Sequence, residues 1–170
     1  DETKKVDFIA NASPLMAAPT AATRVNSANM VANGIPLKLN TKLFTPRVAV
    51  KYDVNEDMNF FASATRGFKS GGWNARGTAP VANQAFDPET VWSYEVGMRS
   101  EWLDRKLRFN VTAFQLDVKD LQTPSAFVAP SGAISFITRN FAGMKNTGVE
   151  VELVANPVED LSLFAFIGRQ

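Results

Sequence analysis

Two glutamates near the C-terminal end of the sequence have a spacing that could support catalysis. Glu150 and Glu152 alternate with apolar residues, so on a β-strand both carboxylates would lie on one face, roughly 7 Å apart. Glycoside hydrolases use a pair of carboxylates at a comparable separation. The simpler interpretation is that both are solvated acids on the wet face of a sheet, and we favour it.

The glycine-rich segment KSGGWNAR, residues 69–76, carries a second set of candidates. Its lysine and arginine could pair with an anionic solute, and its tryptophan could stack on a ring-bearing one. The candidate ligand-binding residues are Lys69, Trp73, Asn74 and Arg76. The alternative is that the two glycines only permit a tight turn beyond a strand. We favour that alternative for the glycines, whereas for the tryptophan and the arginine the two interpretations are level.

Composition excludes several classes of site. The chain of 170 residues has 18 lysines and arginines against 17 acidic residues, so no strongly basic surface suggests nucleic acid as a partner. Histidine is absent, which removes Ser-His-Asp and Cys-His catalysis and every histidine-based metal site. Cysteine is absent as well, so the redox compartment cannot be inferred. We expect no cofactor, no resident metal and no enzymatic activity.

The segment from residue 90 to 121 is the clearest structural element, because its first half alternates strictly between apolar and polar residues. This alternation predicts a β-strand with two different faces. One face has tryptophans at both ends, on the order of 25 Å apart along a tilted strand, which is about the height of the lipid-facing band in an outer-membrane barrel. The predicted lipid-facing residues are Trp92, Tyr94, Val96, Met98 and Trp102, with Ser100 on the same face. The predicted lumen-facing residues are Glu95, Arg99, Glu101, Arg108, Glu150 and Glu152, with Ser93 and Gly97 on the same face.

A turn at Asp104-Arg105 would pair this strand with the next one. It would place Trp102 opposite Leu107, and an opposite-charge pair would form between Glu101 and Arg108. Neither turn residue is a glycine or asparagine. Tight hairpins prefer these residues because the central turn positions require a positive φ. Beyond Ala113 the apolar residues change face, which a β-bulge or emergence of the strand above the membrane would explain.

The remaining segments repeat this organisation. Further strands are predicted at residues 1–8, 44–54, 58–67, 140–156 and 161–168. The long connections 9–42, 68–89 and 123–138 alternate with short turns at 55–57, 103–105 and 157–160. Outer-membrane barrels alternate long extracellular loops with short periplasmic turns in this way. The sequence therefore predicts an all-β fold, with about seven antiparallel strands of a transmembrane up-and-down barrel, the long connections outside the cell and the short turns in the periplasm.

Several motifs resemble a known family. GFKSGGWN at 67–74, PETVWSYEVGMRSEWLDRKLRFNVTAFQLDVKDLQ at 88–122 and NTGVEVEL at 146–153 resemble the barrel of TonB-dependent outer-membrane receptors. TPRVAVKYDVNEDMNFFASATRGF at 45–68 resembles the strand pair that precedes the glycine-rich loop in that family. The resemblance covers residues 45–168. Gln115 and Val118 stand where the family often has tyrosine.

The resemblance implies a 22-stranded barrel filled by an N-terminal plug domain, residing in the bacterial outer membrane as a multi-pass protein. It also implies import of a scarce ligand, such as a ferric siderophore, cobalamin or a saccharide, with energy from the TonB complex. Outer-membrane lipid, the protein's own plug and the TonB complex would be its partners. Residues 1–170 contain no plug or TonB box, start without the zones of a signal peptide and end without a terminal aromatic strand. We therefore expect a partial barrel domain within a longer chain.

Two other classes of protein stay open. A soluble all-β binding or adhesion domain could bury the tryptophan-rich face in a sandwich core, although strands of this length with polar lumen faces argue against it. An outer-membrane barrel hydrolase is disfavoured because the sequence lacks histidine.

Overall fold

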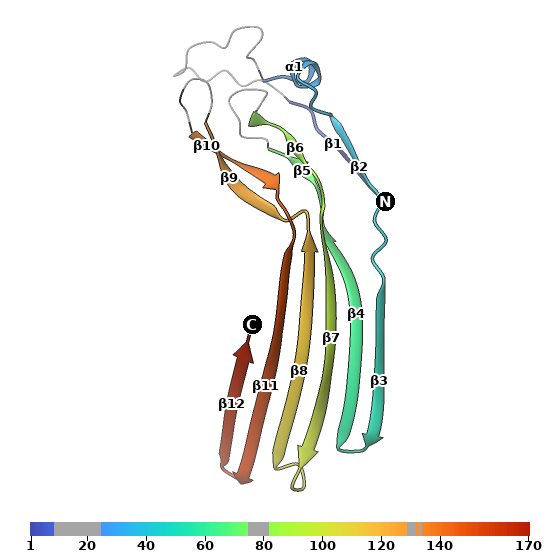
Figure 1. The fold of residues 1–170 in the computed structure, drawn as a ribbon, viewed down its shortest axis with the longest axis vertical. Helices are drawn as coiled ribbons and strands as arrows, with labels where there is room; N and C mark the ends of the chain where they lie inside the picture. Colours follow the sequence, from blue (N-terminus) through green and yellow to red (C-terminus); the bar gives the residue numbers. More distant parts are fainter. Residues whose placement is uncertain (9–24, 75–81, 129–131, 133) are drawn as a thin grey trace. The chain divides into compact units, whose positions relative to one another are not determined.

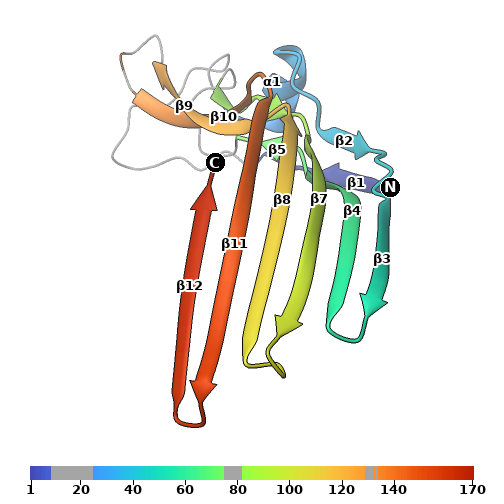
Figure 2. The same ribbon diagram turned by 60° about the horizontal axis from the view of Figure 1, so that its bottom comes forward.

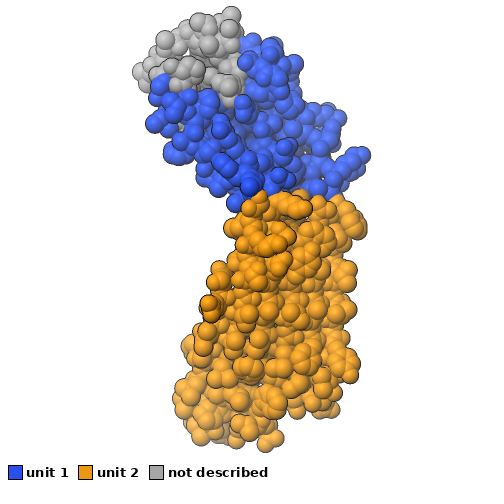
Figure 3. Space-filling view, viewed as in Figure 1, with its two compact units in different colours: residues 1–43, 68–89, 120–142 blue, residues 44–67, 90–119, 143–170 orange. Residues whose placement is uncertain are grey.

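The structure is a computed structural model that describes residues 1–8, 25–74, 82–128, 132 and 134–170. These residues divide into two compact units, coloured separately in Figure 3. Unit 1 comprises residues 1–43, 68–89 and 120–142, and unit 2 comprises residues 44–67, 90–119 and 143–170. In the described part the regular elements are β-strands and one short α-helix, α1 (Ser27–Ala32). None of the helical residues described forms a helix of the length and apolarity that a membrane span requires. The predicted all-β fold is confirmed.

Unit 2 is a single antiparallel sheet of six long strands (Figure 1). The strands are β3 (Arg47–Asn55), β4 (Met58–Lys69), β7 (Glu89–Trp102), β8 (Leu107–Lys119), β11 (Met144–Val158) and β12 (Leu161–Arg169). Their order across the sheet is β12-β11-β8-β7-β4-β3, so each neighbour in sequence is also a neighbour in space. This is the up-and-down topology predicted from the alternation of long and short connections.

The three hairpins of unit 2 have their short turns at the same end of the sheet (Figures 1 and 2). The turns lie at residues 56–57, 103–106 and 159–160, within or next to the predicted segments. The connections that leave the opposite end, from β4 to β7 and from β8 to β11, contain segments of unit 1. The predicted alternation of long and short connections is therefore confirmed.

The register between β7 and β8 also agrees with the prediction. Trp102 pairs with Leu107 and Glu101 with Arg108, and the pairing continues without a shift to Thr90 opposite Lys119. The pairing of β8 with β11 is equally regular. The suggestion of a bulge beyond Ala113 is therefore wrong: the strand keeps its register, and its last apolar residues lie on the polar face of the sheet.

The turn between β7 and β8 contains three residues other than glycine in the left-handed backbone conformation. Leu103, Asp104 and Arg105 have φ angles of 56°, 54° and 65°, and the amide of Lys106 donates to the carbonyl of Leu103 at 3.1 Å. Two-residue hairpin turns of type I′ need positive φ at both central positions, which here are Asp104 and Arg105, and Leu103 before them adopts it as well. Side chains other than glycine pay roughly 1–2 kcal/mol for this conformation.

Unit 1 contains three small two-stranded sheets where the sequence showed little periodicity. β1 (Glu2–Lys5) pairs with β2 (Lys38–Thr41), β5 (Gly72–Trp73) with β6 (Ala85–Phe86), and β9 (Gln122–Val128) with β10 (Ile134–Asn140). One prediction is thereby corrected. The strand predicted at residues 1–8 is not part of the six-stranded sheet, because it pairs with β2 instead. The three long connections, for which no regular elements were predicted, carry a helix and short strands in their described parts.

A small apolar core holds the N-terminal part of unit 1 together. Phe8, Met30 and Ile35 are buried, and Trp73 packs against this cluster from the β5–β6 hairpin. The helix α1 begins at a proper cap, because the side chain of Asn26 accepts a hydrogen bond from the amide of Asn29 at 2.9 Å.

Candidate functional site

The six-stranded sheet has two chemically different faces. We call the face that carries Val96 the apolar face and the face that carries Arg99 the polar face. The apolar face bears the predicted lipid-facing residues Trp92, Tyr94, Val96, Met98 and Trp102. The polar face bears the predicted lumen-facing residues Glu95, Arg99, Glu101, Arg108, Glu150 and Glu152. The structure thus brings each predicted set together on one side, whereas their exposure to lipid or water stays a prediction.

The apolar face ends at a boundary that slants across the strands. The last apolar residues before it are Trp92 on β7, Ala113 on β8, Val149 on β11 and Ile167 on β12. In the register of the sheet this boundary moves toward the short turns by about two residues per strand, averaged over the four strands. A strand tilt of 35–45° shifts a membrane boundary by roughly one to one and a half residues per strand, so the slant is of the same order as that tilt produces, but steeper.

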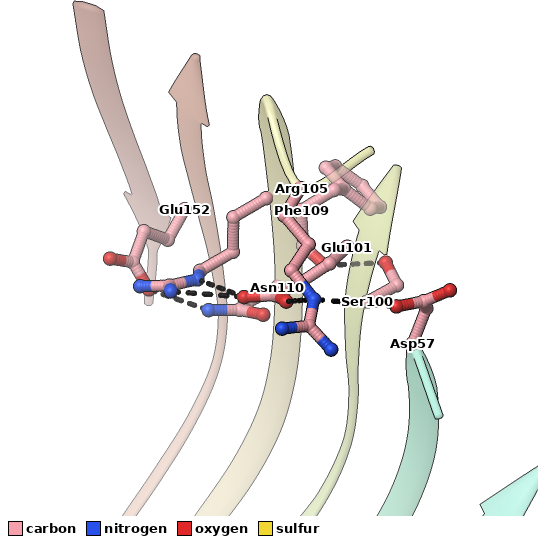
Figure 4. A network of polar contacts seen from close by, with 8 residues as sticks. Asp57, Ser100, Glu101, Arg105, Phe109, Asn110 and Glu152 are labelled. Carbon is pink, nitrogen blue, oxygen red and sulfur yellow. Dashed lines mark hydrogen bonds and ion pairs between the residues drawn. The ribbon is translucent and has the colours of Figure 1, made fainter. Parts of the chain in front are cut away.

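An ionic network occupies the polar face near the short turns (Figure 4). The guanidinium of Arg108 donates to Glu101 at 3.0 and 3.3 Å, and Arg105 lies 3.5 Å from Glu101 and 3.8 Å from Asp57. The backbone amide of Glu101 also donates to the carbonyl of Asp57 at 2.8 Å. The network therefore ties the β7–β8 turn to the β3–β4 turn. Most of its side chains are well exposed, so each ion pair contributes at most about 1 kcal/mol.

The apolar face carries one buried hydroxyl at the same level. Ser100 is 1% exposed, donates to the carbonyl of Phe109 at 2.7 Å and accepts from the indole nitrogen of Trp102 at 2.9 Å. Both polar groups are thereby satisfied within the strand pair (Figure 4 labels Ser100 and Phe109). Such pairing offsets the cost of burying polar groups.

Two glycines on the polar face make room for aromatic rings. A Cβ atom on Gly97 would lie 2.6 Å from the ring of Phe61, and one on Gly148 would lie 2.6 Å from the ring of Phe114. Arg99 lies over the Phe61 ring, 5.1 Å from its centroid, in the geometry of a cation–π contact. Neighbouring strands of the sheet are therefore held by side-chain packing at these glycines as well as by backbone hydrogen bonds.

The glutamate pair does not form a catalytic cleft. Glu152 accepts a hydrogen bond from the side chain of Asn110 at 2.9 Å, and both Glu150 and Glu152 are exposed. Glu152 lines a shallow depression of about 490 Å³ together with other residues of the ionic network. Among the described residues, no group of three or more metal-ligating side chains converges. Both carboxylates lie on an exposed surface, and their interpretation as solvated acids stays a prediction.

Of the candidate ligand-binding residues in the glycine-rich segment, two make hydrogen bonds within the protein and one is exposed. The indole nitrogen of Trp73 donates to the carbonyl of Pro36 at 2.6 Å, and the side chain of Asn74 donates to the carbonyls of Gln84 and Thr138 at 3.0 and 2.9 Å. Lys69 is exposed at the end of β4. Arg76 lies outside the described residues. Ligand contact by these four residues stays a prediction.

Sequence reasoning overlooked Gln122 and Asn140, which bond to backbone groups remote in sequence. Gln122 is 8% exposed and donates to the carbonyls of Ser70 and Asp87, 52 and 35 positions away. A buried glutamine at a strand start carries no local pattern, so only the structure could reveal its role.

Comparison with known proteins identifies the architecture. Residues 20–169 match the family model described as TonB dependent receptor-like, beta-barrel. The chain belongs to this family. Among curated members, the metal-pseudopaline receptor CntO of Pseudomonas aeruginosa is 38% identical over 79 residues, which are 46% of this chain and 10% of that protein. The ferric-pyoverdine 358 receptor of Pseudomonas putida is 25% identical over 120 residues, 71% of this chain and 14% of that protein.

Solved structures of receptors share the fold. The ferric yersiniabactin uptake receptor FyuA from Yersinia pestis aligns with a TM-score of 0.57 and 22% identity, over 71% of this chain and 17% of that one. FpvA from P. aeruginosa, in structures with heterologous pyoverdines, aligns with a TM-score of 0.50 and 20% identity, over 79% and 18%. The six strands are therefore part of a TonB-dependent receptor barrel. The chain spans between a tenth and a fifth of the length of these relatives.

Proposed function

We propose that the complete protein is an outer-membrane receptor that imports a metal-chelating small molecule of the ferric siderophore class, with energy from the TonB complex. The family match over residues 20–169 carries this proposal. The names of the two curated relatives describe receptors for a metal chelate and for a ferric chelate, which favours such a ligand over cobalamin or a saccharide. The proposal requires two partners: a plug domain in the rest of the same chain, and the TonB complex of the cell.

In this proposal the apolar face of the six-stranded sheet contacts lipid and the polar face borders the water-filled interior. Two observations support it: the alternation of apolar and polar residues between the two faces of β7 from Trp92 to Trp102, and the slanted boundary at Trp92, Ala113, Val149 and Ile167. An open sheet leaves backbone groups unpaired at its edges, and in hydrocarbon each unpaired group costs several kcal/mol. The exposed edges β3 and β12 must therefore pair with further strands of the same barrel.

The proposed orientation rests on the alternation of long and short connections, because outer-membrane barrels have long extracellular loops and short periplasmic turns. We place the short turns at 55–57, 103–105 and 157–160 in the periplasm and the connections 68–89 and 123–138 outside the cell, where ligand arrives. The exposed Lys69 then lies among the extracellular loops, and the charged network at Glu101 and Arg108 lies near the periplasmic rim. Loops that carry binding residues on a rigid scaffold are the usual arrangement in such proteins.

Uptake of labelled iron tests the proposal. The full-length gene would be expressed in a bacterial strain that lacks its own siderophore receptors, and cells would receive radioactive iron as ferric pyoverdine, as a ferric catecholate or as a ferric hydroxamate. We expect accumulation of iron with at least one chelate, and loss of accumulation when TonB is deleted. Accumulation that persists without TonB, or uptake of cobalamin or maltodextrin in place of every ferric chelate, would refute it.

A further inference from the structure

Three amide side chains of unit 1 bond to backbone groups of neighbouring hairpins. The most buried is Gln122, at the start of β9. Its Nε2 atom donates to the carbonyls of Ser70 and Asp87, each at 3.0 Å, and lies 3.4 Å from the carbonyl of Lys69. Its backbone amide donates to the carboxylate of Glu89 at 2.8 Å. Gln122 therefore connects the end of β4, the end of β6 and the beginning of β7.

Asn140 stands directly opposite Gln122 in the β9–β10 register. Its Oδ1 atom accepts from the amide of Asp87 at 2.7 Å, and its Nδ2 atom donates to the carbonyls of Asp87 and Asp120 at 2.9 and 2.8 Å. The backbone of Asp87 is thus held by both amides, one from each strand of the hairpin.

Asn74 makes the reciprocal connection from the other hairpin. Its Nδ2 atom donates to the carbonyls of Gln84 and Thr138, and its Oδ1 atom accepts from the amide of Thr138 at 2.7 Å. Thr138 lies opposite Pro124 in the register, and proline has no N–H to offer its neighbour. Hydrogen bonds therefore run in both directions between β5–β6 and β9–β10.

We propose that Asn74, Gln122 and Asn140 form an amide clamp that fastens the paired strands of β5–β6 and of β9–β10 into one block, so that the two strand pairs do not move independently. A sheet as short as β5–β6 is not stable alone, and its strands have two residues each. Its order must come from outside the hairpin, and the clamp supplies fixed donors and acceptors for it.

The clamp makes Gln122 a positioning residue for the segment at 69–74. The carbonyls of Lys69 and Ser70 are acceptors of Gln122, and a Cβ atom on Gly71 would lie 2.5 Å from the carbonyl of Phe86. This role rests on the proposed function, in which that segment lies on the extracellular side, where ligand arrives. The block itself is a claim about the loops alone and is tested without any ligand.

Hydrogen exchange of the full-length protein in outer-membrane vesicles tests the clamp. Gln122→Glu keeps the shape of the side chain but replaces the donor with an acceptor that faces three carbonyls, and Gln122→Met keeps the volume without a donor. We expect protection at the amides of Asp87 and Thr138 to fall together, by roughly tenfold or more in the glutamate variant and less in the methionine variant. Asp87→Ala is the matched control, because Asp87 takes part through its backbone atoms, and it should leave protection unchanged.

Two results would overturn the proposal. If Gln122→Met has wild-type protection, the side chain only fills space. If Gln122→Glu lowers protection near residue 122 but not at Thr138, the hairpins are independent. Unchanged protection of β7 and β8 in every variant shows that the barrel still folds. A receptor that fails to import ferric chelates would leave this measurement unaffected, so the two failures are distinguishable.

Discussion

Gly97 offers a sharp test of the packing of the sheet. A Cβ atom at this position would lie 2.5 Å from the carbonyl oxygen of Val111 and 2.6 Å from the ring of Phe61. Cβ atoms almost never approach other atoms within 3.0 Å, and the Val111 oxygen is a backbone atom that cannot rotate away. Gly97→Ala must therefore displace β8 relative to β7 or move the Phe61 ring away from Arg99.

The expected cost combines two opposing terms. Overpacking of this kind costs about 1–3 kcal/mol, whereas replacing a strand glycine with alanine returns roughly 0.5–1 kcal/mol of chain entropy. We expect a net loss of about 1–2 kcal/mol in the free energy of unfolding. Gly67→Ala is the matched control on an interior strand of the same sheet, because the nearest atom to its Cβ is Cγ1 of Val91 at 3.4 Å, an ordinary van der Waals distance, and it should stabilise slightly.

Denaturant unfolding of the full-length receptor in lipid vesicles, followed by tryptophan fluorescence, measures both variants. Adding Phe61→Ala to Gly97→Ala should recover part of the loss, because it removes the ring but not the Val111 oxygen. Equal stability of the two single variants would refute the close approach of β7 to β8 at this point.

Two further predictions concern the turns and the orientation. Leu103 is 72% exposed with a φ of 56°, so Leu103→Gly should raise the unfolding free energy by about 0.5–1 kcal/mol. Leu103→Pro should prevent the hairpin, because proline cannot adopt a positive φ. The same denaturant titration measures both variants, and a loss of stability in the glycine variant would contradict the prediction. Protease added to intact cells should cut the full-length receptor within residues 68–89 before it cuts at Arg105, and mass spectrometry of the first fragments decides, since early cleavage at Arg105 would reverse the orientation.

The long strands could be predicted because their evidence is local. Alternation from Trp92 to Trp102 fixes the two faces, and once the turn is placed at Asp104-Arg105 the register follows residue by residue. The position of Phe114 on the polar face could not be predicted from the sequence. Its ring fits there because Gly148, on a strand far along the chain, leaves space for it. A change in periodicity alone cannot separate this situation from a bulge.

The loops could not be predicted for a related physical reason. β1 finds its partner at residues 38–41, across a long connection without periodicity. Gln122, Asn140 and Asn74 act through backbone carbonyls, which every residue possesses, so no pairing of residue types marks their contacts. The positive φ of Leu103 is likewise imposed by the two strands that the turn joins, against the preference of the residue itself.

The most direct test of the barrel wall is the accessibility of neighbouring positions on β7. The chain contains no cysteine, so single cysteines at Glu95, Val96, Met98 and Arg99 can be introduced into the full-length receptor; Gly97 is avoided because it has no room for a side chain. We predict that a reagent confined to the bilayer labels positions 96 and 98, and that a water-soluble reagent small enough to enter the barrel labels positions 95 and 99. The reverse pattern, or labelling of all four positions by the water-soluble reagent, would contradict the placement of this sheet in the membrane.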